Sequence, residues 1–104
     1  PALIAVVSDT TPRFGEVSFY KEDYSAAIEN MLLAATALGY AVGWIDGVLH
    51  NDAVRVPVSE ILGLPDDRLL TVLVPVGKPA ATPTRRDKKP FEQRACWDQY
   101  SLKR

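Results

Sequence analysis

The stretch that decides the fold is residues 23–47, DYSAAIENMLLAATALGYAVGWIDG. It predicts a helix that is apolar on nearly every side, a glycine stop at Gly39 and a short strand leading into residues 44–47. A helix without a broad polar face has to be covered all round. A chain of 104 residues has little other material with which to cover it. We therefore expect the missing cover to come from further chain or from a partner chain.

The rest of the sequence predicts an α/β order of elements within one small domain. Asp23 is the expected N-cap of the helix and Gly39 its C′ residue. Gly43, inside the second strand, indicates a close approach of backbone or ligand. The expected segments are strands over residues 2–7, 40–45 and 69–76, a loop over 10–22, a loop leading to a short helix over 51–62, a turn over 63–67 and an extended tail from Gly77. The continuous apolar run of the first strand predicts that it is buried on both faces, and the third strand is also expected to be buried.

Composition places the chain among ordinary globular domains. The formal net charge is -1, with 47% hydrophobic and 24% charged residues. No apolar run approaches the roughly 20 residues that a membrane span needs. Cys96 is the only cysteine, so it cannot form an internal disulfide, and it fits a reducing, cytoplasmic setting. We expect no membrane partner.

The charge is unevenly distributed along the chain. Residues 84–104 hold seven basic and three acidic side chains, whereas residues 1–83 hold five basic and ten acidic ones. This basic tail could bind a nucleic acid, bind a small anion or be a solvated end. Nucleic acid is the weakest of these interpretations because the tail lacks interleaved aromatic residues and the whole domain is not basic.

Two features of the sequence indicate a binding site, and neither is a complete motif. The first is the strand end Trp44-Ile45-Asp46-Gly47, where backbone amides could hold the polar edge of a flat ligand. The second is the basic run at 85–89, whose charges could neutralise a phosphate. An ordinary strand-to-loop turn and a solvated charge run are the alternatives. His50 is the only histidine and is expected in a loop, so no metal site and no Ser/His/Asp set is predicted.

The chain also resembles the C-terminal half of the FMN-dependent nitroreductase family. The resemblance covers nearly the whole chain, and it depends on several short segments that occur in the order typical of the family. These segments are Asp23 with Glu29–Ala35 and Gly39, then residues 44–47, 61–65 (ILGLP), 74–79 (VPVGKP) and 88–92 (KKPFE), followed by Trp97 and Tyr100. It implies an α/β (α+β) fold with a mixed sheet and flanking helices, of which only the C-terminal half is present. Residues 1–104 would then be the C-terminal part of a nitroreductase-like domain, with 84–104 as its basic tail.

The same resemblance implies an activity and its site residues. It implies an FMN oxidoreductase that takes hydride from NAD(P)H and passes it to a small electron acceptor, in a homodimer with FMN at the subunit interface. Trp44 and Ile45 would line the flavin ring, and the amides of Asp46 and Gly47 would donate to its N5 and O4 atoms. Arg86 and Lys88 would bind the FMN phosphate, with Arg85 and Lys89 as alternatives. Because the flavin does the chemistry, no catalytic side chain is expected.

The resemblance does not extend to the N-terminal half of the family, which includes an Arg-Ser-x-Arg phosphate motif. We therefore expect a cut or truncated chain, or one half of a split enzyme, which is inactive without the complementary half. Phe19 and Tyr20 could line the substrate face, although ordinary packing is the simpler interpretation. The alternative function is a flavin-free interaction module that binds a partner through its apolar helix. The sequence selects neither the acceptor nor NADH over NADPH.

Overall fold

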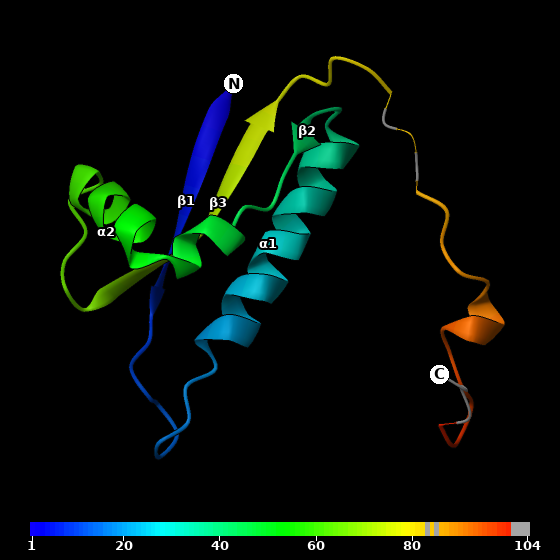
Figure 1. Cartoon of the computed structure of the whole chain (residues 1–104), viewed down its shortest axis with the longest axis horizontal. Helices are drawn as coiled ribbons and strands as arrows, with labels where there is room; N and C mark the ends of the chain where they lie inside the picture. The colour runs from blue at the N-terminus through cyan, green and yellow to red at the C-terminus, as the bar shows by residue number, and fades with distance from the viewer. Residues whose placement is uncertain (83, 85, 101–104) are drawn as a thin grey trace.

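The fold combines a small antiparallel sheet with two α-helices, and a computed structural model describes residues 1–82, 84 and 86–100. The elements follow one another as β1 (Ala2–Asp9), α1 (Tyr20–Ala37), β2 (Ala41–Val42), the 3₁₀ helix η1 (Gly47–His50), α2 (Asp52–Ile61), β3 (Arg68–Gly77) and the 3₁₀ helix η2 (Phe91–Gln93). Figure 1 shows α1 lying along the sheet and the segment after β3 leaving the body of the molecule. The expected α/β (α+β) class is confirmed.

The sheet has the strand order β1-β3-β2, and both pairs are antiparallel. β3 is the central strand, which explains its continuous apolar sequence. The pairing of β1 with β3 shifts between Val6 and Val7, whose partners are Val72 and Leu70. The residue left over in β3 is Thr71, and its hydroxyl donates to the Val6 carbonyl over 3.0 Å. This side chain therefore satisfies a backbone acceptor at the bulge.

The core lies between α1 and one face of β3. Ile28, Val72 and Val74 are the buried residues at its centre, and Tyr24, Met31 and Leu32 of α1 pack against them. The opposite side of α1 is open, because Leu33 is 61% exposed. The helix is therefore covered on one side only within the described residues.

The first strand is less buried than the sequence predicted. Ala2, Leu3 and Ile4 are exposed, and Leu3 keeps 60% of its surface accessible. The prediction that residues 2–7 are buried on both faces is wrong, because among the described residues β1 is an edge strand paired with β3 alone and its first residues are left uncovered. β3, the third strand, was expected to be buried, and on one face its Leu70, Val72 and Val74 are almost fully buried.

The two ends of α1 differ in how well the sequence predicted them. The N-cap is Phe19, which makes no side-chain capping bond, so the assignment of this role to Asp23 is wrong. Asp23 lies in the first turn, where its negative charge interacts favourably with the helix dipole. The C-terminal end is as expected: Gly39 has a φ of +81°, and the Tyr40 amide donates to the Ala35 carbonyl over 2.9 Å. This pattern is a Schellman motif.

The predicted strand over residues 40–45 does not pair continuously with its neighbour β3. Regular pairing covers only Ala41–Val42, after which the Gly43 amide donates to the Pro75 carbonyl over 3.1 Å. Pro75 has no N–H with which to return the bond. Pairing resumes where Ile45 and Leu73 exchange two hydrogen bonds of 3.0 and 2.9 Å. A Cβ added at Gly43 would lie 3.2 Å from the Pro75 ring, so the close approach predicted at this glycine is confirmed.

The segment after this strand is more helical than expected. η1 contains His50 as its last residue, so the prediction of a loop at that position is wrong. α2 begins at once after Asn51, whose side chain accepts a hydrogen bond of 3.0 Å from the Ala53 amide. This is a side-chain N-cap. Pro57 lies inside α2, and the turn that follows is opened by Gly63 with a φ of +66°.

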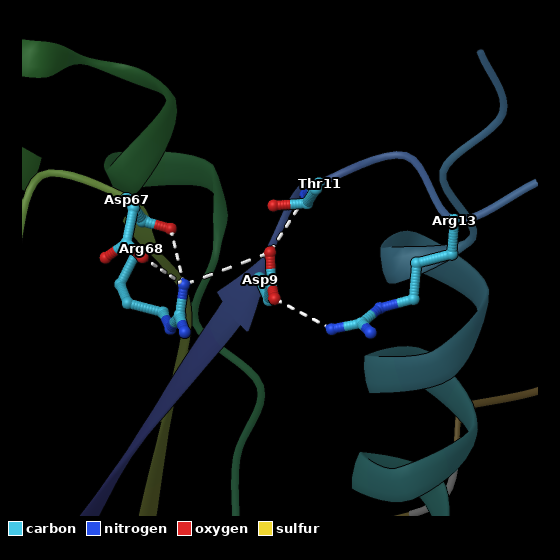
Figure 2. Close-up of polar contacts among 5 residues, drawn as sticks. All are labelled: Asp9, Thr11, Arg13, Asp67 and Arg68. Atoms are coloured by element: carbon cyan, nitrogen blue, oxygen red, sulfur yellow. Dashed lines mark hydrogen bonds and ion pairs between the residues drawn. The ribbon is translucent and has the colours of Figure 1, made fainter. Parts of the chain in front are cut away.

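A polar cluster ties the loop after β1 to the beginning of β3. Figure 2 shows Asp9 between Arg13 on one side and Arg68 on the other. Its carboxylate accepts hydrogen bonds of 2.9 Å from the Thr11 amide and from Arg13, and Arg68 lies 3.9 Å away. Hydrogen bonding from Thr11, helped by the two guanidinium groups, lowers the pKa of Asp9 from 3.8 to about 2.

The segment after β3 forms an arm that leaves the body (Figure 1). The radius of gyration is 17.7 Å, against about 13 Å for a compact domain of this length. The arm contains η2, and the Phe91 and Trp97 rings lie 6.1 Å apart with Trp97 80% exposed. The expected extended tail is therefore present. None of the helices among the described residues is both long and apolar enough to cross a bilayer.

Candidate functional site

Residues 44–47 form the end of the edge strand and the entry to η1. The two bonds between Ile45 and Leu73 fix the strand to the sheet, and the Trp44 ring lies 6.3 Å from that of Tyr24 on α1. Asp46 then turns the chain with φ -127° and ψ -34°, and its carbonyl accepts a hydrogen bond of 2.8 Å from the Leu49 amide. Contacts with β3, α1 and η1 therefore fix the position of this segment.

The backbone amides of Asp46 and Gly47 are two consecutive hydrogen-bond donors at the entry to η1. Within residues 1–82, 84 and 86–100, neither amide donates a hydrogen bond to the protein. No heavy atom lies within 4 Å of the position that a Cβ on Gly47 would take, so this side of the turn is open. A flat ligand with acceptors along one edge could approach both amides.

Asp46 also borders a cleft of about 280 Å³. Tyr20, Lys21 and Tyr24 come from the first turns of α1, and Leu49 and His50 come from η1. The remaining walls are Asp52 and Arg55 of α2 and residues 69–71 of β3. The cleft is thus bordered by α1, by the consecutive helices η1 and α2, and by the beginning of β3.

The predicted phosphate pair lies on the arm. Arg86 and Lys88 are both exposed, and no ion pair is formed by either among the residues that the structure describes. Arg85 lies outside the described residues. The Lys89 carbonyl accepts a hydrogen bond of 2.6 Å from the Arg94 side chain. The structure brings Trp44, Ile45, Asp46 and Gly47 together as one segment, but no hydrogen bond or ion pair within the described chain joins that segment to Arg86 or Lys88.

Other residues named from the sequence have ordinary surroundings. Phe19 packs edge-on against Phe14, with ring centroids 6.0 Å apart. Tyr20 lines the cleft, and its role at a substrate face stays a prediction. Cys96 is half-buried on the arm. No group of three His, Cys, Asp or Glu side chains in the described parts of the chain could hold a metal ion.

Sequence reasoning missed the cleft. Lys21, His50 and Arg55 belong to different elements, and no local spacing connects them. Only the packing of α1 beside η1 and α2 brings these side chains around one space. In the sequence, Lys21 and Arg55 are recognisable only as charged residues near the starts of two helices, and nothing there indicates that they line one cleft.

Comparison with known proteins identifies the family. Residues 4–78 match the family model described as Nitroreductase family. Because this match covers most of the chain, the chain belongs to the nitroreductase family. A protein of Archaeoglobus fulgidus, provisionally named NADH dehydrogenase/NAD(P)H nitroreductase, is 32% identical over 92 residues, which are 86% of this chain and 49% of that protein.

Solved structures agree with this assignment. A protein of Bacteroides thetaiotaomicron with the same provisional name superposes with a TM-score of 0.76 and 26% identity, over 94% of this chain and 55% of that one. An FMN-dependent nitroreductase of Clostridium difficile superposes with a TM-score of 0.75 over 94% of this chain and 57% of that one. The identity to the latter is 17%, so it shows the fold alone. The chain spans about half the length of each of these proteins.

Proposed function

We propose that this chain forms part of an FMN-dependent oxidoreductase that transfers reducing equivalents from NAD(P)H to a small acceptor such as a nitroaromatic or a quinone. The observation on which this rests is the pair of amides at Asp46 and Gly47, which have no acceptor among the described residues and lie on a strand end fixed to the sheet. Membership of the nitroreductase family supports it, as does the NAD(P)H nitroreductase name of the Archaeoglobus relative. The FMN dependence of a protein with the same fold supports the choice of cofactor.

The chain's own residues would bind and orient the flavin. The amides of Asp46 and Gly47 would donate to its ring edge, with Trp44 and Ile45 against one face. When bound, FMN supplies the hydride chemistry, and fixed donors favour the negative charge of its reduced form. Arg86 and Lys88 would neutralise the phosphate. No side chain of this chain is proposed as a catalytic acid or base.

The site requires a second chain or further chain. In the view of Figure 1, the arm after β3 and the segment between β2 and α2 lie on opposite sides of α1, and the sequence puts Arg86 and Lys88 on this arm. We infer that residues 1–104 act as the C-terminal part of a nitroreductase-like domain, with 84–104 as a basic tail. A second copy or a complementary N-terminal half would complete the flavin site. The proposed setting is the cytoplasm, without nucleic acid or membrane partners.

One observation favours a second candidate function, a flavin-free interaction module. The side of α1 that faces away from the sheet is open and carries Leu33, which is 61% exposed. A partner would bind this side, since Met31 and Leu32 are turned toward the core. A stable colourless complex that is lost on Leu33→Asp substitution would support the module and contradict the oxidoreductase.

Flavin titration of the purified assembly tests the phosphate residues. We expect Arg86→Ala/Lys88→Ala to weaken FMN binding by at least about tenfold, because each charge-assisted hydrogen bond contributes roughly 1.5–3 kcal/mol. The matched control is Arg86→Lys/Lys88→Arg, which preserves both charges and should retain most of the affinity. Unchanged affinity in the alanine variant would remove the phosphate role.

The amide role has a separate test in the flavin midpoint potential. Gly47→Pro removes the N–H, whereas Gly47→Ala keeps it and places a methyl group in open space. Loss of a donor to the reduced ring should make the potential about 30–65 mV more negative, since 1.4 kcal/mol corresponds to about 30 mV for two electrons. Asp46→Asn should change little because the backbone donates. Equal potentials in the proline and alanine variants, both folded by circular dichroism, would refute the amide role.

A further inference from the structure

Gly43 and Pro75 meet at the break between two paired parts of the edge strand. Before the break, β2 pairs regularly with the end of β3, and after it Ile45 exchanges two hydrogen bonds with Leu73. The one hydrogen bond at the break runs from the Gly43 amide to the Pro75 carbonyl over 3.1 Å. Gly43 is therefore the position at which the chain passes from β2 to residues 44–47.

The contact with Pro75, and not the backbone conformation, requires a glycine at this position. Gly43 is not among the described residues with a positive φ, so a residue with a side chain could adopt its backbone conformation. A Cβ at Gly43 would lie 3.2 Å from Cγ and 3.7 Å from Cδ of Pro75, and these are the only neighbouring atoms within 4 Å of it in the described structure. The Pro75 ring by itself therefore excludes a side chain at Gly43.

The Pro75 ring has little freedom to move away from its neighbour. Proline closes its side chain onto its own backbone nitrogen, and Pro75 lies in β3, which is also paired with β1 along its other edge. A side chain at Gly43 would therefore displace the edge strand rather than β3. That displacement would reach Ile45, two residues further on, and then the amides of Asp46 and Gly47.

We propose that Gly43 and Pro75 form a positioning pair. The absence of a side chain at Gly43 lets residues 44–47 lie against β3, and this fixes the place of the Asp46 and Gly47 amides. A binding group has to be held within about 0.5 Å of its productive position, so a displaced strand would weaken these donors without removing them. The inference rests on the proposed function only for the identity of what the amides bind.

Hydrogen exchange at the Ile45 and Leu73 amides tests the positioning without flavin. We expect Gly43→Ala to speed exchange at these two amides by about tenfold, because overpacking opens the strand locally, whereas exchange in the β1–β3 pairs should change little. Gly77→Ala is the matched control in the same sheet, since its φ is not positive and a Cβ there would meet no atom within 4 Å. This control should not speed exchange at either amide.

Removal of the proline ring should reverse the effect. Gly43→Ala/Pro75→Ala lacks the Cγ and Cδ atoms that the new Cβ would meet, so exchange at Ile45 should return to within about twofold of that in Pro75→Ala alone. Unchanged exchange in Gly43→Ala, or faster exchange that persists in the double variant, would overturn the positioning pair. Equal acceleration throughout the sheet would also overturn it, because a general loss of stability would explain that result. If Gly43→Ala does not fold, recovery of the fold in the double variant supports the pair and failure to recover it overturns the pair.

FMN titration of the purified assembly separates this inference from the proposed function. Gly43→Ala should weaken FMN binding about two- to tenfold, the range for one hydrogen bond, and the double variant with Pro75→Ala should restore it. Gly77→Ala should leave the affinity unchanged. Faster local exchange with unchanged FMN affinity would support the positioning pair and contradict the flavin role of residues 44–47. Weaker FMN binding without faster exchange would overturn the pair and leave the proposed function intact.

Discussion

The one-sided covering of α1 makes a prediction about stability. Ile28 is fully buried between Val72 and Val74, whereas Leu33 on the same helix is 61% exposed. Replacing a buried isoleucine by alanine costs about 2–5 kcal/mol, because apolar contacts are lost and a cavity remains. Leu33 buries about two fifths of its surface, so Leu33→Ala should cost roughly 1 kcal/mol or less, partly offset by the better helix propensity of alanine.

Thermal unfolding followed by circular dichroism distinguishes the two substitutions. For a chain of this size, 1 kcal/mol corresponds to a shift of about 4–8 °C in Tm. Ile28→Ala should therefore lower Tm by at least about 8 °C and Leu33→Ala by at most about 8 °C. Similar large losses in both variants would refute the one-sided picture and show that a second copy or further chain covers the outer side. A Tm that rises with protein concentration would identify a second copy as that cover.

Two further predictions concern local interactions. The pKa of Asp9 is lower in the folded chain, so its stabilising contribution is present above pH 3.8 and is lost as the pH falls through about 2. Acid unfolding of the native chain should therefore be steeper in this window than that of Asp9→Asn, and identical acid curves would contradict the role of the cluster. Asn51→Ala should destabilise α2 by roughly 1 kcal/mol in urea unfolding, because the cap on the Ala53 amide is lost. Asn51→Asp keeps the acceptor and should be nearly neutral, whereas equal midpoints for the alanine and aspartate variants would count against the cap.

Local chemistry made several features predictable from the sequence. Gly39 was recognisable as the end of α1 because a positive φ is easily adopted only by glycine, and Gly43 because a side chain there would meet its neighbour. The apolar run of β3 indicated a buried strand. Each of these conclusions depends on one residue type or one short pattern, and the structure agrees with all three.

Elements that depend on distant contacts were predicted less well. α1 begins at Tyr20 without a capping side chain, because Tyr24 packs on the core and against Trp44 and so stabilises the added turn. The second strand is broken at Gly43 because Pro75, thirty-two positions later, cannot return a hydrogen bond. Neither cause is visible in the local sequence, where Asp23 looked like a good cap and residues 40–45 like one strand.

The candidate site likewise has some features that the sequence predicted and others that only the tertiary structure shows. The sequence by itself determined that residues 44–47 would end a strand and that a basic run would follow β3, since both are local patterns. The tertiary structure alone decided that the amides of Asp46 and Gly47 lack acceptors among the described residues, because this depends on which strand edges are paired. It also decided that Lys21 and His50 border one cleft and that Arg86 lies apart on an arm. Contacts between residues far apart in the chain are set by packing, and a single sequence does not encode them in any local pattern.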